Sequence, residues 1–365
     1  RALYDGNANV YNEKFVENGT HTIKAYVQDD AGNVNSTELR TLTIENTAPT
    51  INFTYPTPVN ATYKNNVTVN ITTTDNANHS TFVDWDNSLV GWWRMEGDGD
   101  DYFGVNNGTI TGASYTSAGK LGGAMSFDGV GDYIDVDSTN AKFDSVVQGN
   151  VTFATWFNLE SYDDNANNYL AGLIAYAPGG SDLGKQSLAL VMNGASMYFL
   201  VSNVTGAGNY DSASQGGIGL NTWYQAVGVK NDTHISLYLD GVLKSSTATT
   251  RAPFDSSLYL GILQSSQVLN GSLDDAMIFN RSLGADEILA LYNSTAYTHD
   301  FTGDLVSNTN YTYKAYTQDV AGNVNTTEER EVYFDTTAPE IDFVSPTPAN
   351  ATYKNNVTIN ITTTD

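Results

Sequence analysis

The chain has 365 residues, of which 16 are Lys or Arg and 41 are Asp or Glu, so its formal net charge is −25; it has no cysteine. This charge opposes binding to nucleic acids and to anionic lipids, which both need clustered cations, and the missing cysteine excludes disulfides and thiolate metal sites. A content of 40% hydrophobic and 12% aromatic residues, with much Asn, Thr, Ser and Gly, favours all-β domains with sizeable cores.

Alternating strand-like segments begin within residues 5–46, where THTIKAYVQD (20–29) and ELRTLTI (38–44) flank a turn. Residues 47–86 continue the pattern with TINFTY (50–55) and VTVNITTT (67–74), which a Pro-Thr-Pro turn separates. Period-two alternation between turn clusters is typical of half-buried β-strands. Both segments are therefore predicted to consist of strands.

These segments return near the end of the chain. ATYKNNVTVNITTTD at 61–75 recurs with one change at 351–365, and DDAGNVNSTE at 29–38 recurs as DVAGNVNTTE at 319–328, both 290 residues later. Ala2-Leu3-Tyr4 also matches Ala290-Leu291-Tyr292, the end of a helical pattern at 285–292. A fixed period of this kind predicts a tandem array of one unit, and the chain is interpreted as a window on that array.

The order of the segments predicts that one domain is inserted into another. The repeated segments resemble immunoglobulin-like surface repeats of bacteria and archaea, in which a T-A-P entry comes first and a hairpin such as YVQDDAGN (26–33) comes near the end. Here that hairpin precedes the opening strands, and a half-sandwich alone leaves an open edge and half a core. The predicted division is 1–4 (end of a preceding central domain), 5–46 (closing half of a sandwich), 47–86 (opening half of the next), 88–293 (inserted domain), 294–335 (closing half of that sandwich) and 338–365 (opening half of a following one).

The central block contains a series of landmarks in a fixed order: LVGWWRMEGDGDD (89–101), GKLGGAMSFDGVGDYIDV (119–136), NVTFATWFNLE (150–160), a hairpin at 221–246 and LNGSLDDAMIFNRSLGADEILALYN (269–293). They resemble the laminin-G-like, concanavalin-A-like jelly-roll domains over about 200 residues. Pattern alone also predicts sandwich strands here. Ile235, Leu237 and Leu239 alternate inward before an Asp240-Gly241 hairpin turn.

The jelly-roll resemblance implies a calcium ion held by acidic residues of these landmarks, and Ca²⁺ is the one cofactor expected. The candidate ligands are Asp128, Asp132 and Asp274, since a hard cation takes oxygens from several loops. Asp275 stands beside the last of them. The alternative is that pairs such as Asp128-Gly129 only form turns.

Some residues of the central block are candidates for sugar binding or for catalysis. The loops at 161–169 and 203–211 are plausible sugar-binding rims, whereas Trp92, Trp93, Trp156 and Trp223 lie in strand landmarks and are predicted to be core residues. Asp135 and Asp137 alternate as glycosidase carboxylates do. However, an E-x-D-x-E string is absent and the four His are scattered. No enzyme is predicted, and no catalytic residue is assigned.

The pattern N-x-S/T is frequent and predicts an extracellular, cell-surface glycoprotein, although Thr-rich strands alone raise its frequency. The candidate glycosylation sites are Asn18, Asn35, Asn52, Asn60, Asn66, Asn70, Asn78, Asn107, Asn150, Asn203, Asn231, Asn270, Asn280, Asn293, Asn310, Asn325, Asn350, Asn356 and Asn360.

The function predicted from these features is that of a structural and adhesive repeat unit in a surface protein or filament, with neighbouring copies of itself as head-to-tail partners. Glycans or another cell surface are further candidate partners, and neither nucleic acid nor membrane insertion is expected. Two alternatives stay open: a dedicated carbohydrate-binding module with immunoglobulin-like spacers, and an accessory region of a large secreted glycan-degrading enzyme.

Overall fold

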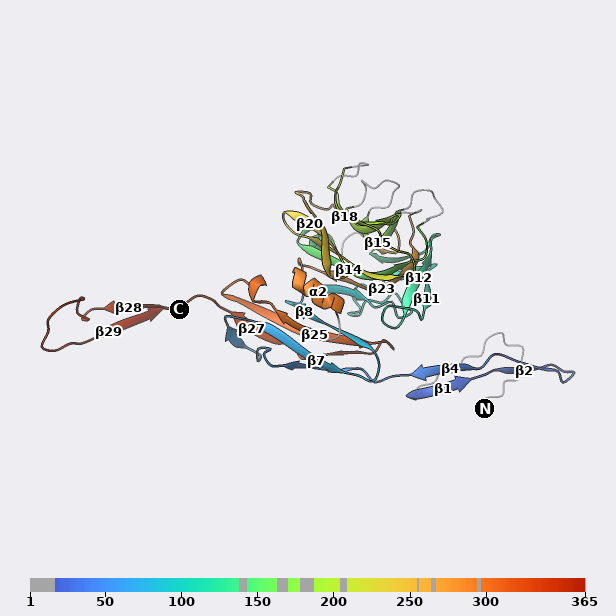
Figure 1. Ribbon diagram of the computed structural model, residues 1–365, viewed down its shortest axis with the longest axis horizontal. Coiled ribbons are helices and arrows are strands. Elements are labelled where there is room, and N and C mark those ends of the chain that lie inside the picture. Colours follow the sequence, from blue (N-terminus) through green and yellow to red (C-terminus); the bar gives the residue numbers. More distant parts are fainter. Residues whose placement is uncertain are drawn as a thin grey trace.

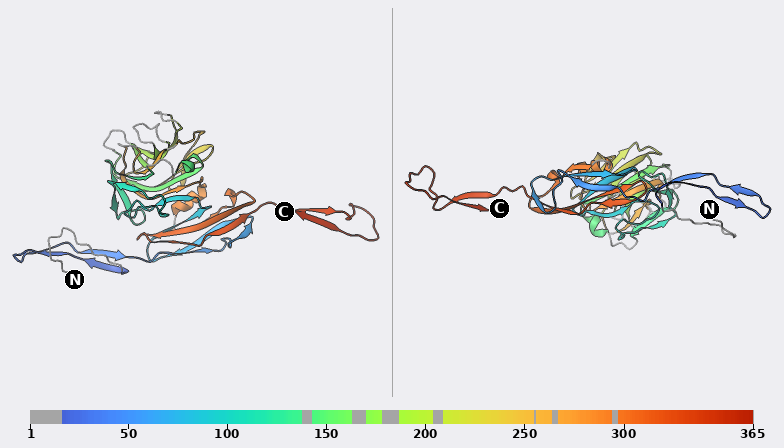
Figure 2. Two further views of the ribbon diagram at one scale, coloured as in Figure 1. Left: turned by 180° about the vertical axis from the view of Figure 1, so that it is seen from behind. Right: turned by 90° about the horizontal axis from the view of Figure 1, so that it is seen from below.

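The computed structural model describes residues 17–364 except 138–142, 163–169, 178–186, 204–208, 255, 264–266 and 294–296. The molecule is elongated, with a two-layer sandwich at its centre, a jelly roll seated on one side of that sandwich, and a narrow β-ribbon projecting at each end (Figures 1 and 2). Among the described residues, no helix has the length and apolarity needed to cross a bilayer.

The jelly roll consists of two facing antiparallel sheets. One has the strand order β10-β13-β22-β15-β16-β17-β18, and the other β11-β12-β23-β14-β19-β20-β21 with β9 also beside β23. Its elements are β9 (Leu89–Trp93), β10 (Thr109–Thr111), β11 (Ser114–Thr116), β12 (Ala124–Asp128), β13 (Tyr133–Asp137), α1 (Asp144–Gln148), β14 (Val151–Leu159), β15 (Leu170–Ala177), β16 (Leu188–Asn193), β17 (Ser196–Val201), β18 (Asp211–Gly216), β19 (Trp223–Lys230), β20 (His234–Leu239), β21 (Val242–Ala248), β22 (Ser257–Leu260), β23 (Asn270–Phe279) and α2 (Ala285–Asn293).

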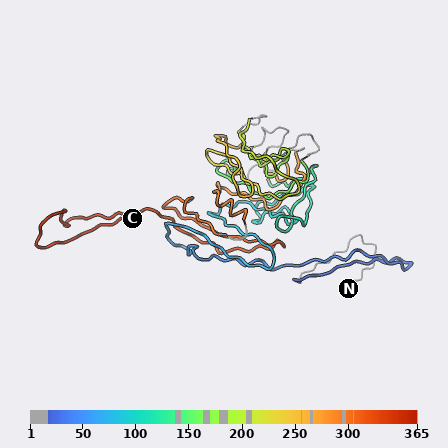
Figure 3. The backbone as a smooth tube through the Cα atoms, in the orientation of Figure 1, coloured from blue at the N-terminus to red at the C-terminus, as the bar shows by residue number. Residues whose placement is uncertain are grey.

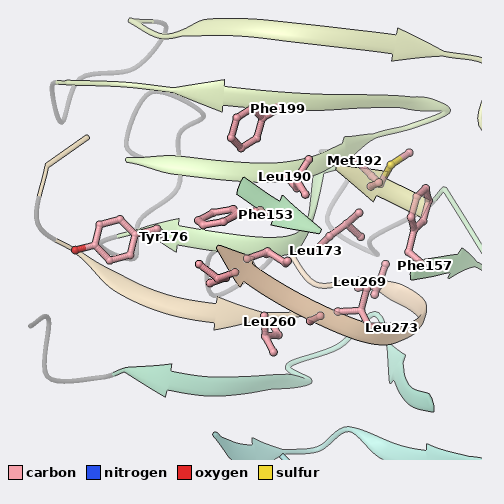
Figure 4. Packing of buried hydrophobic residues seen from close by; sticks show 14 of the residues in the cluster. Phe153, Phe157, Leu173, Tyr176, Leu190, Met192, Phe199, Leu260, Leu269 and Leu273 are labelled. Atoms are coloured by element: carbon pink, nitrogen blue, oxygen red, sulfur yellow. The ribbon is translucent and has the colours of Figure 1, made fainter. Parts of the chain in front are cut away.

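Apolar side chains from both sheets fill the space between them. Phe153 and Phe199 meet edge-on with ring centroids 6.2 Å apart, and Leu173, Leu190 and Leu273 pack around them (Figure 4). The absent side chain of Gly228 leaves room for the Phe199 ring, which would lie 2.3 Å from a Cβ there. The sheet arrangement confirms the predicted all-β jelly roll.

Local predictions for the β20–β21 hairpin are also confirmed. Ile235, Leu237 and Leu239 are buried. Asp240 and Gly241 have φ of 51° and 74°, the left-handed backbone that a two-residue hairpin turn requires at both positions.

The central sandwich is formed by two chain segments that the jelly roll separates. The first provides β5 (Thr50–Thr54), β6 (Thr62–Lys64), β7 (Thr68–Thr74) and β8 (His79–Trp85). The second provides β24 (Tyr297–Asp300), the 3₁₀ turn η2 (Thr302–Asp304), β25 (Thr309–Asp319), β26 (Val324–Thr326) and β27 (Arg330–Phe334).

Both sheets of this sandwich contain strands of both segments. One sheet has the order β24-β7-β5, and the other β26-β25-β27-β6 with β8 also beside β25. Trp85 lies at the centre of the core, stacked on Phe301 with centroids 4.2 Å apart and on Tyr313 at 5.3 Å. Neither segment can therefore bury its apolar residues without the other.

The jelly roll is fixed to the sandwich by a shared apolar cluster. Phe82 of β8 and Tyr316 of β25 stack on each other and contact Trp92 of β9 edge-on, at centroid distances of 5.3 Å, 5.1 Å and 6.0 Å. Helix α2 supplies Ile288 to the same cluster and lies between the two domains in Figure 1. Trp92 is buried as predicted, but it lies against the neighbouring domain and not between the jelly-roll sheets.

The ribbons at the two ends are hairpins with little or no buried surface of their own. The N-terminal ribbon comprises β1 (Gly19–Ile23), β2 (Tyr26–Gln28), β3 (Val34–Ser36) and β4 (Arg40–Ile44), and the C-terminal ribbon comprises β28 (Glu340–Val344) and β29 (Asn360–Thr364). The single strand predicted over residues 20–29 is two strands, β1 and β2. The equivalent strand β25 of the sandwich is continuous because it pairs with β8 along seven residues, whereas β2 pairs only with the short strand β3.

Truncation of Phe82 tests the docking of the jelly roll. Phe82→Ala leaves a cavity between the two domains, so we expect the free energy of unfolding to fall by about 3–5 kcal/mol, measured by urea denaturation. The exposed Tyr55 serves as the control, because Tyr55→Ala removes a ring that makes no core contact. Equal effects of the two substitutions would contradict this account of the junction.

Candidate functional site at the junction of the two domains

Four carboxyl groups gather where the jelly roll meets the sandwich. Glu96 follows β9, Asp274 and Asp275 lie in β23, and Asp319 ends β25. The register of β23 against β14 shifts beside Asp275, whose φ is 46°. Such a bulge redirects side chains locally, and here two consecutive carboxyl groups reach the buried junction.

Backbone and indole N–H groups hold these carboxylates. Lys120 N and Leu121 N donate to Asp274 Oδ2 at 2.8 and 3.0 Å, and Trp92 Nε1 donates to Asp275 Oδ1 at 2.9 Å. Gly123 N donates to Glu96 Oε2 at 3.1 Å. The carboxyl groups therefore connect the loop before β12 to β23 through Asp274 and to the segment after β9 through Glu96, and they connect β9 to β23 through Asp275.

The turn that follows β25 brings the sandwich into contact with this carboxyl cluster. Arg94 donates to Gly322 O at 2.5 Å, and a Cβ on Gly122 would lie only 2.6 Å from Val320 O. Within the turn, Asp319 accepts hydrogen bonds from Ala321 N and Asn323 N. The turn, with sequence DVAGN, is thus held by its own aspartate and docks as a formed unit.

Burial dominates the electrostatics of this cluster. Desolvation raises the pKa of Glu96 to about 7, and the neighbouring Asp275 and Asp319 add to the rise. Desolvation, opposed by the Trp92 hydrogen bond and Arg94, raises the pKa of Asp275 to about 6. Burial and the adjacent Asp275 raise the pKa of Asp274 well above its ordinary value. Burial at the junction therefore moves the pKa of Glu96, Asp274 and Asp275 towards neutral pH.

A cavity of about 370 Å³ lies beside the carboxylates. Residues of β8, β14, β19 and the end of α2 line it, including Trp156, Gln225 and Tyr292. Trp156 stacks on Tyr292 with centroids 5.5 Å apart, and the Lys120 ammonium lies 4.2 Å from the Trp156 ring centroid. Gln225 Oε1 is buried there without a hydrogen-bond partner. The aromatic and amide groups are suited to a small polar ligand.

The three predicted calcium ligands are not brought to one point. Asp128 pairs with Asn270, and Met125 pairs with Leu273, so Asp274 lies four residues, or about 13 Å, along the sheet from Asp128. Asp128 N donates to Asp132 Oδ2 at 2.9 Å. The described residues contain no group of three His, Cys, Asp or Glu arranged to hold a metal ion. Calcium remains a prediction, restricted to the loop of Asp128 and Asp132.

The candidate glycosylation sites lie mostly on the surface. Asn70, Asn231 and Asn270 are half-buried, and the other predicted sites are exposed. The sugar-binding rims were predicted at 161–169 and 203–211, and of these, residues 163–169 and 204–208 lie outside the described residues. The side chain of Asp137 also lies outside them.

The sequence did not indicate the junction site. Arg94 and Glu96 stand in the landmark RMEGD, where only their position directly after an apolar strand could have signalled a buried role. Nothing local links them to Asp275 or to the turn after β25, which lie about 180 and 225 residues further along the chain.

A match to a known protein family agrees with the jelly-roll topology of the domain between β8 and β24. Residues 128–289 match the family described as the concanavalin A-like lectin/glucanases superfamily. The inserted domain is a concanavalin A-like jelly roll. No curated protein matches the chain significantly.

Several solved structures are similar to this chain at low identity. Domain 4 of an extracellular arabinanase from Geobacillus stearothermophilus, in complex with arabinotriose, is 18% identical with a TM-score of 0.41, over 56% of this chain and 98% of that one. The receptor-binding domain of a botulinum neurotoxin C/D mosaic serotype is 16% identical, with a TM-score of 0.45 over 57% and 51%. A Trypanosoma rangeli sialidase in complex with sialic acid is 16% identical, with a TM-score of 0.44 over 56% and 33%.

The raised pKa of Glu96 predicts a pH-dependent stability. A carboxyl group whose pKa is higher in the folded protein stabilises it fully below its unfolded pKa of 4.5, and this contribution is lost as the pH rises through about 7. We expect the thermal unfolding midpoint to fall between about pH 5 and pH 8, and to fall less in Glu96→Gln, which stays neutral. Glu160→Gln, at an exposed carboxylate, is the control. Parallel pH profiles for the wild type and Glu96→Gln would exclude this role.

Calcium binding is tested by calorimetry of the same chain. If Asp132 is a ligand, millimolar Ca²⁺ raises the unfolding midpoint relative to a chelator, since a ligand that binds only the folded state stabilises it. Asp132→Asn should remove that difference, whereas Asp274→Asn should leave it. Identical midpoints for the wild type with Ca²⁺ and with chelator would refute the calcium prediction.

Proposed function

We propose that this chain is a repeat unit of an extracellular, glycosylated surface protein or filament. β-Sandwiches of the immunoglobulin-like type form its axis, and jelly rolls inserted into them project from that axis. The proposal assigns no catalytic role to the chain, and its partners are neighbouring copies of the same unit.

One observation carries this proposal: the strands on either side of the jelly roll belong to a single sandwich. β8 runs antiparallel to β25 from His79↔Asp319 to Trp85↔Tyr313, although the jelly roll lies between them in the sequence. An insertion of this kind holds a large domain at both of its ends. Together with the apolar contact around Trp92, it supports a rigid display of the jelly roll.

The connection between successive units is also ordered. Asn323 Nδ2 donates to Glu45 O at 3.0 Å, and Asn325 Nδ2 donates to Pro49 O at 2.9 Å. These bonds join the segment after β4 to the β25–β26 hairpin of the sandwich. An ordered connection supports a stiff axis and opposes free rotation of the units.

A second candidate function is carbohydrate binding by the jelly roll. The family match over residues 128–289 and the aromatic cavity beside Trp156 favour it. A glycan array probed with the full chain tests it. Binding that Trp156→Ala abolishes, and that Trp223→Ala outside the cavity lining leaves intact, would support this function.

The array is tested on the native material. We expect electron micrographs of the purified assembly to show a thin filament with lateral globules at regular intervals. Under denaturing conditions, a species near 39.4 kDa indicates a polymer of separate subunits, and a much larger species indicates one long polypeptide. Isolated particles without lateral globules would contradict the proposed display.

Glycosylation is tested by peptide mapping of the native protein. We expect glycans at exposed sites such as Asn52 and Asn66, because the transferase needs an accessible amide. Asn70 should carry little, since its amide donates to Thr54 Oγ1 at 3.0 Å and to Tyr55 O at 3.2 Å. Unmodified asparagine at every exposed site would refute the glycoprotein assignment.

A further inference from the structure

The cavity beside Trp156 lies between the two domains. Its lining combines β8 of the sandwich with β14 and β19 of the jelly roll and the end of α2, at the side of the sandwich on which the jelly-roll backbone is seated (Figure 3). Phe157 points into the jelly-roll core, so the adjacent Trp156 points to the outer face of the same sheet. A molecule bound in this cavity therefore contacts both domains.

A candidate glycosylation site stands in the sandwich part of this lining. Residues 78–80 read Asn-His-Ser, and all three line the cavity. Val320 N donates to Asn78 O at 3.0 Å, which extends the pairing of β8 with β25 by one residue. Phe82 of β8 packs against the jelly roll, and alternation along the strand places Asn78 on the same face. Asn78 is exposed, so its amide is accessible and directed toward the jelly roll.

The polar groups of the lining fit a ligand that both donates and accepts hydrogen bonds. Gln225 lies opposite Trp156 in the sheet and is 3% exposed, and its Oε1 has no hydrogen-bond partner among the described residues. This amide oxygen needs a donor, whereas the Lys120 ammonium beside the Trp156 ring can only donate. A neutral molecule with hydroxyl groups satisfies both. A cation would be repelled by Lys120, and an anion would lie beside Asp275.

The size and the aromatic surface of the cavity also fit sugar residues. Its volume of about 370 Å³ lies at the lower end of the range for ligand pockets, which is about 300–1,000 Å³ and here leaves room for about one or two sugar residues. Trp156 and Tyr292 stack with centroids 5.5 Å apart and offer apolar surface to the C–H groups of a sugar ring. The cavity is therefore suited to the innermost part of a glycan.

We infer that a glycan attached to Asn78 occupies the junction cavity and joins the sandwich to the jelly roll. In the attachment step, the Asn78 side-chain nitrogen forms a bond to the anomeric carbon of a sugar activated by diphosphate; the diphosphate group leaves with its bonding electrons, and the nitrogen loses a proton. Because Asn78 lies in the lining, the first sugar residues meet Gln225 and Lys120 at a high effective concentration. The inference rests on the proposed glycosylation and names the place that one glycan takes in the fold.

The test measures how accessible each glycan is in the folded native protein. Mild periodate cleaves accessible vicinal diols of sugars, and peptide mapping then reads the oxidation at each site. We expect the innermost sugar residues on Asn78 to stay intact, whereas those on Asn66, an exposed site outside the cavity lining, are oxidised. In denaturant, both glycans should be oxidised alike, which controls for their chemical composition.

Substitutions in the glycosylated chain connect this protection to the cavity. Trp156→Ala removes the packing surface and should abolish the protection of the Asn78 glycan, whereas Trp223→Ala, outside the lining, should leave it. Asn78→Gln removes the glycan, and we expect the thermal unfolding midpoint to fall by about 2–4 °C, the shift expected for one lost buried hydrogen bond in a domain of about 200 residues. Asn66→Gln should leave the midpoint unchanged.

Several results would overturn the inference. One is equal oxidation of the glycans on Asn78 and Asn66 in the folded protein, and another is an unmodified Asn78 in a chain that carries glycans elsewhere. Both results leave the glycoprotein assignment standing, whereas a chain without a glycan at any site refutes the two together. Equal unfolding midpoints for the wild type and Asn78→Gln would also contradict a glycan that joins the domains.

Discussion

Half of a β-sandwich cannot bury its own apolar face, and this constraint explains the organisation of the whole chain. In the centre of the molecule, the opening strands β5–β8 and the closing strands β24–β27 meet around Trp85. Each segment contributes to both sheets, so the core exists only where both are present. The ribbons at the two ends have equivalent sequences and hairpin pairing, but their core residues face solvent.

The insertion makes the jelly roll part of this arrangement. Its chain leaves the sandwich after β8 and returns at β24, and the loop at the first crossing is held by the buried Asp84, whose carboxylate accepts hydrogen bonds from Ser88 N and Leu89 N at 2.8 and 3.0 Å. The outer face of one jelly-roll sheet then packs on Phe82 and Tyr316. Two chain crossings and an apolar contact therefore hold the jelly roll on the sandwich.

Polar chemistry at the junction complements these apolar contacts. Glu96 and Asp274 accept hydrogen bonds from the loop before β12, and Asp275 accepts one from the Trp92 indole of β9. Arg94 donates to the turn of the sandwich. Burial keeps the pKa of each of these carboxyl groups above its ordinary value. Protonation of carboxyl groups therefore couples the contact between the domains to the pH of the medium, in a chain whose net charge is −25.

Local patterns in the sequence were sufficient to predict most of the strands, the jelly-roll domain, the hairpin turn at Asp240-Gly241 and the 290-residue period. Each of these depends on residues that are close together in the chain or on nearly identical strings. The exposed aliphatic row at Val357, Ile359 and Ile361 could also be anticipated from its match to residues 67–71. Only the tertiary structure decided that Trp92 lies against a neighbouring domain, that Asp274 is separated from Asp128 and Asp132, and that Glu96 meets Asp319. Those placements depend on how strands far apart in the chain pair and on where a bulge turns their side chains, and no short segment of sequence encodes either.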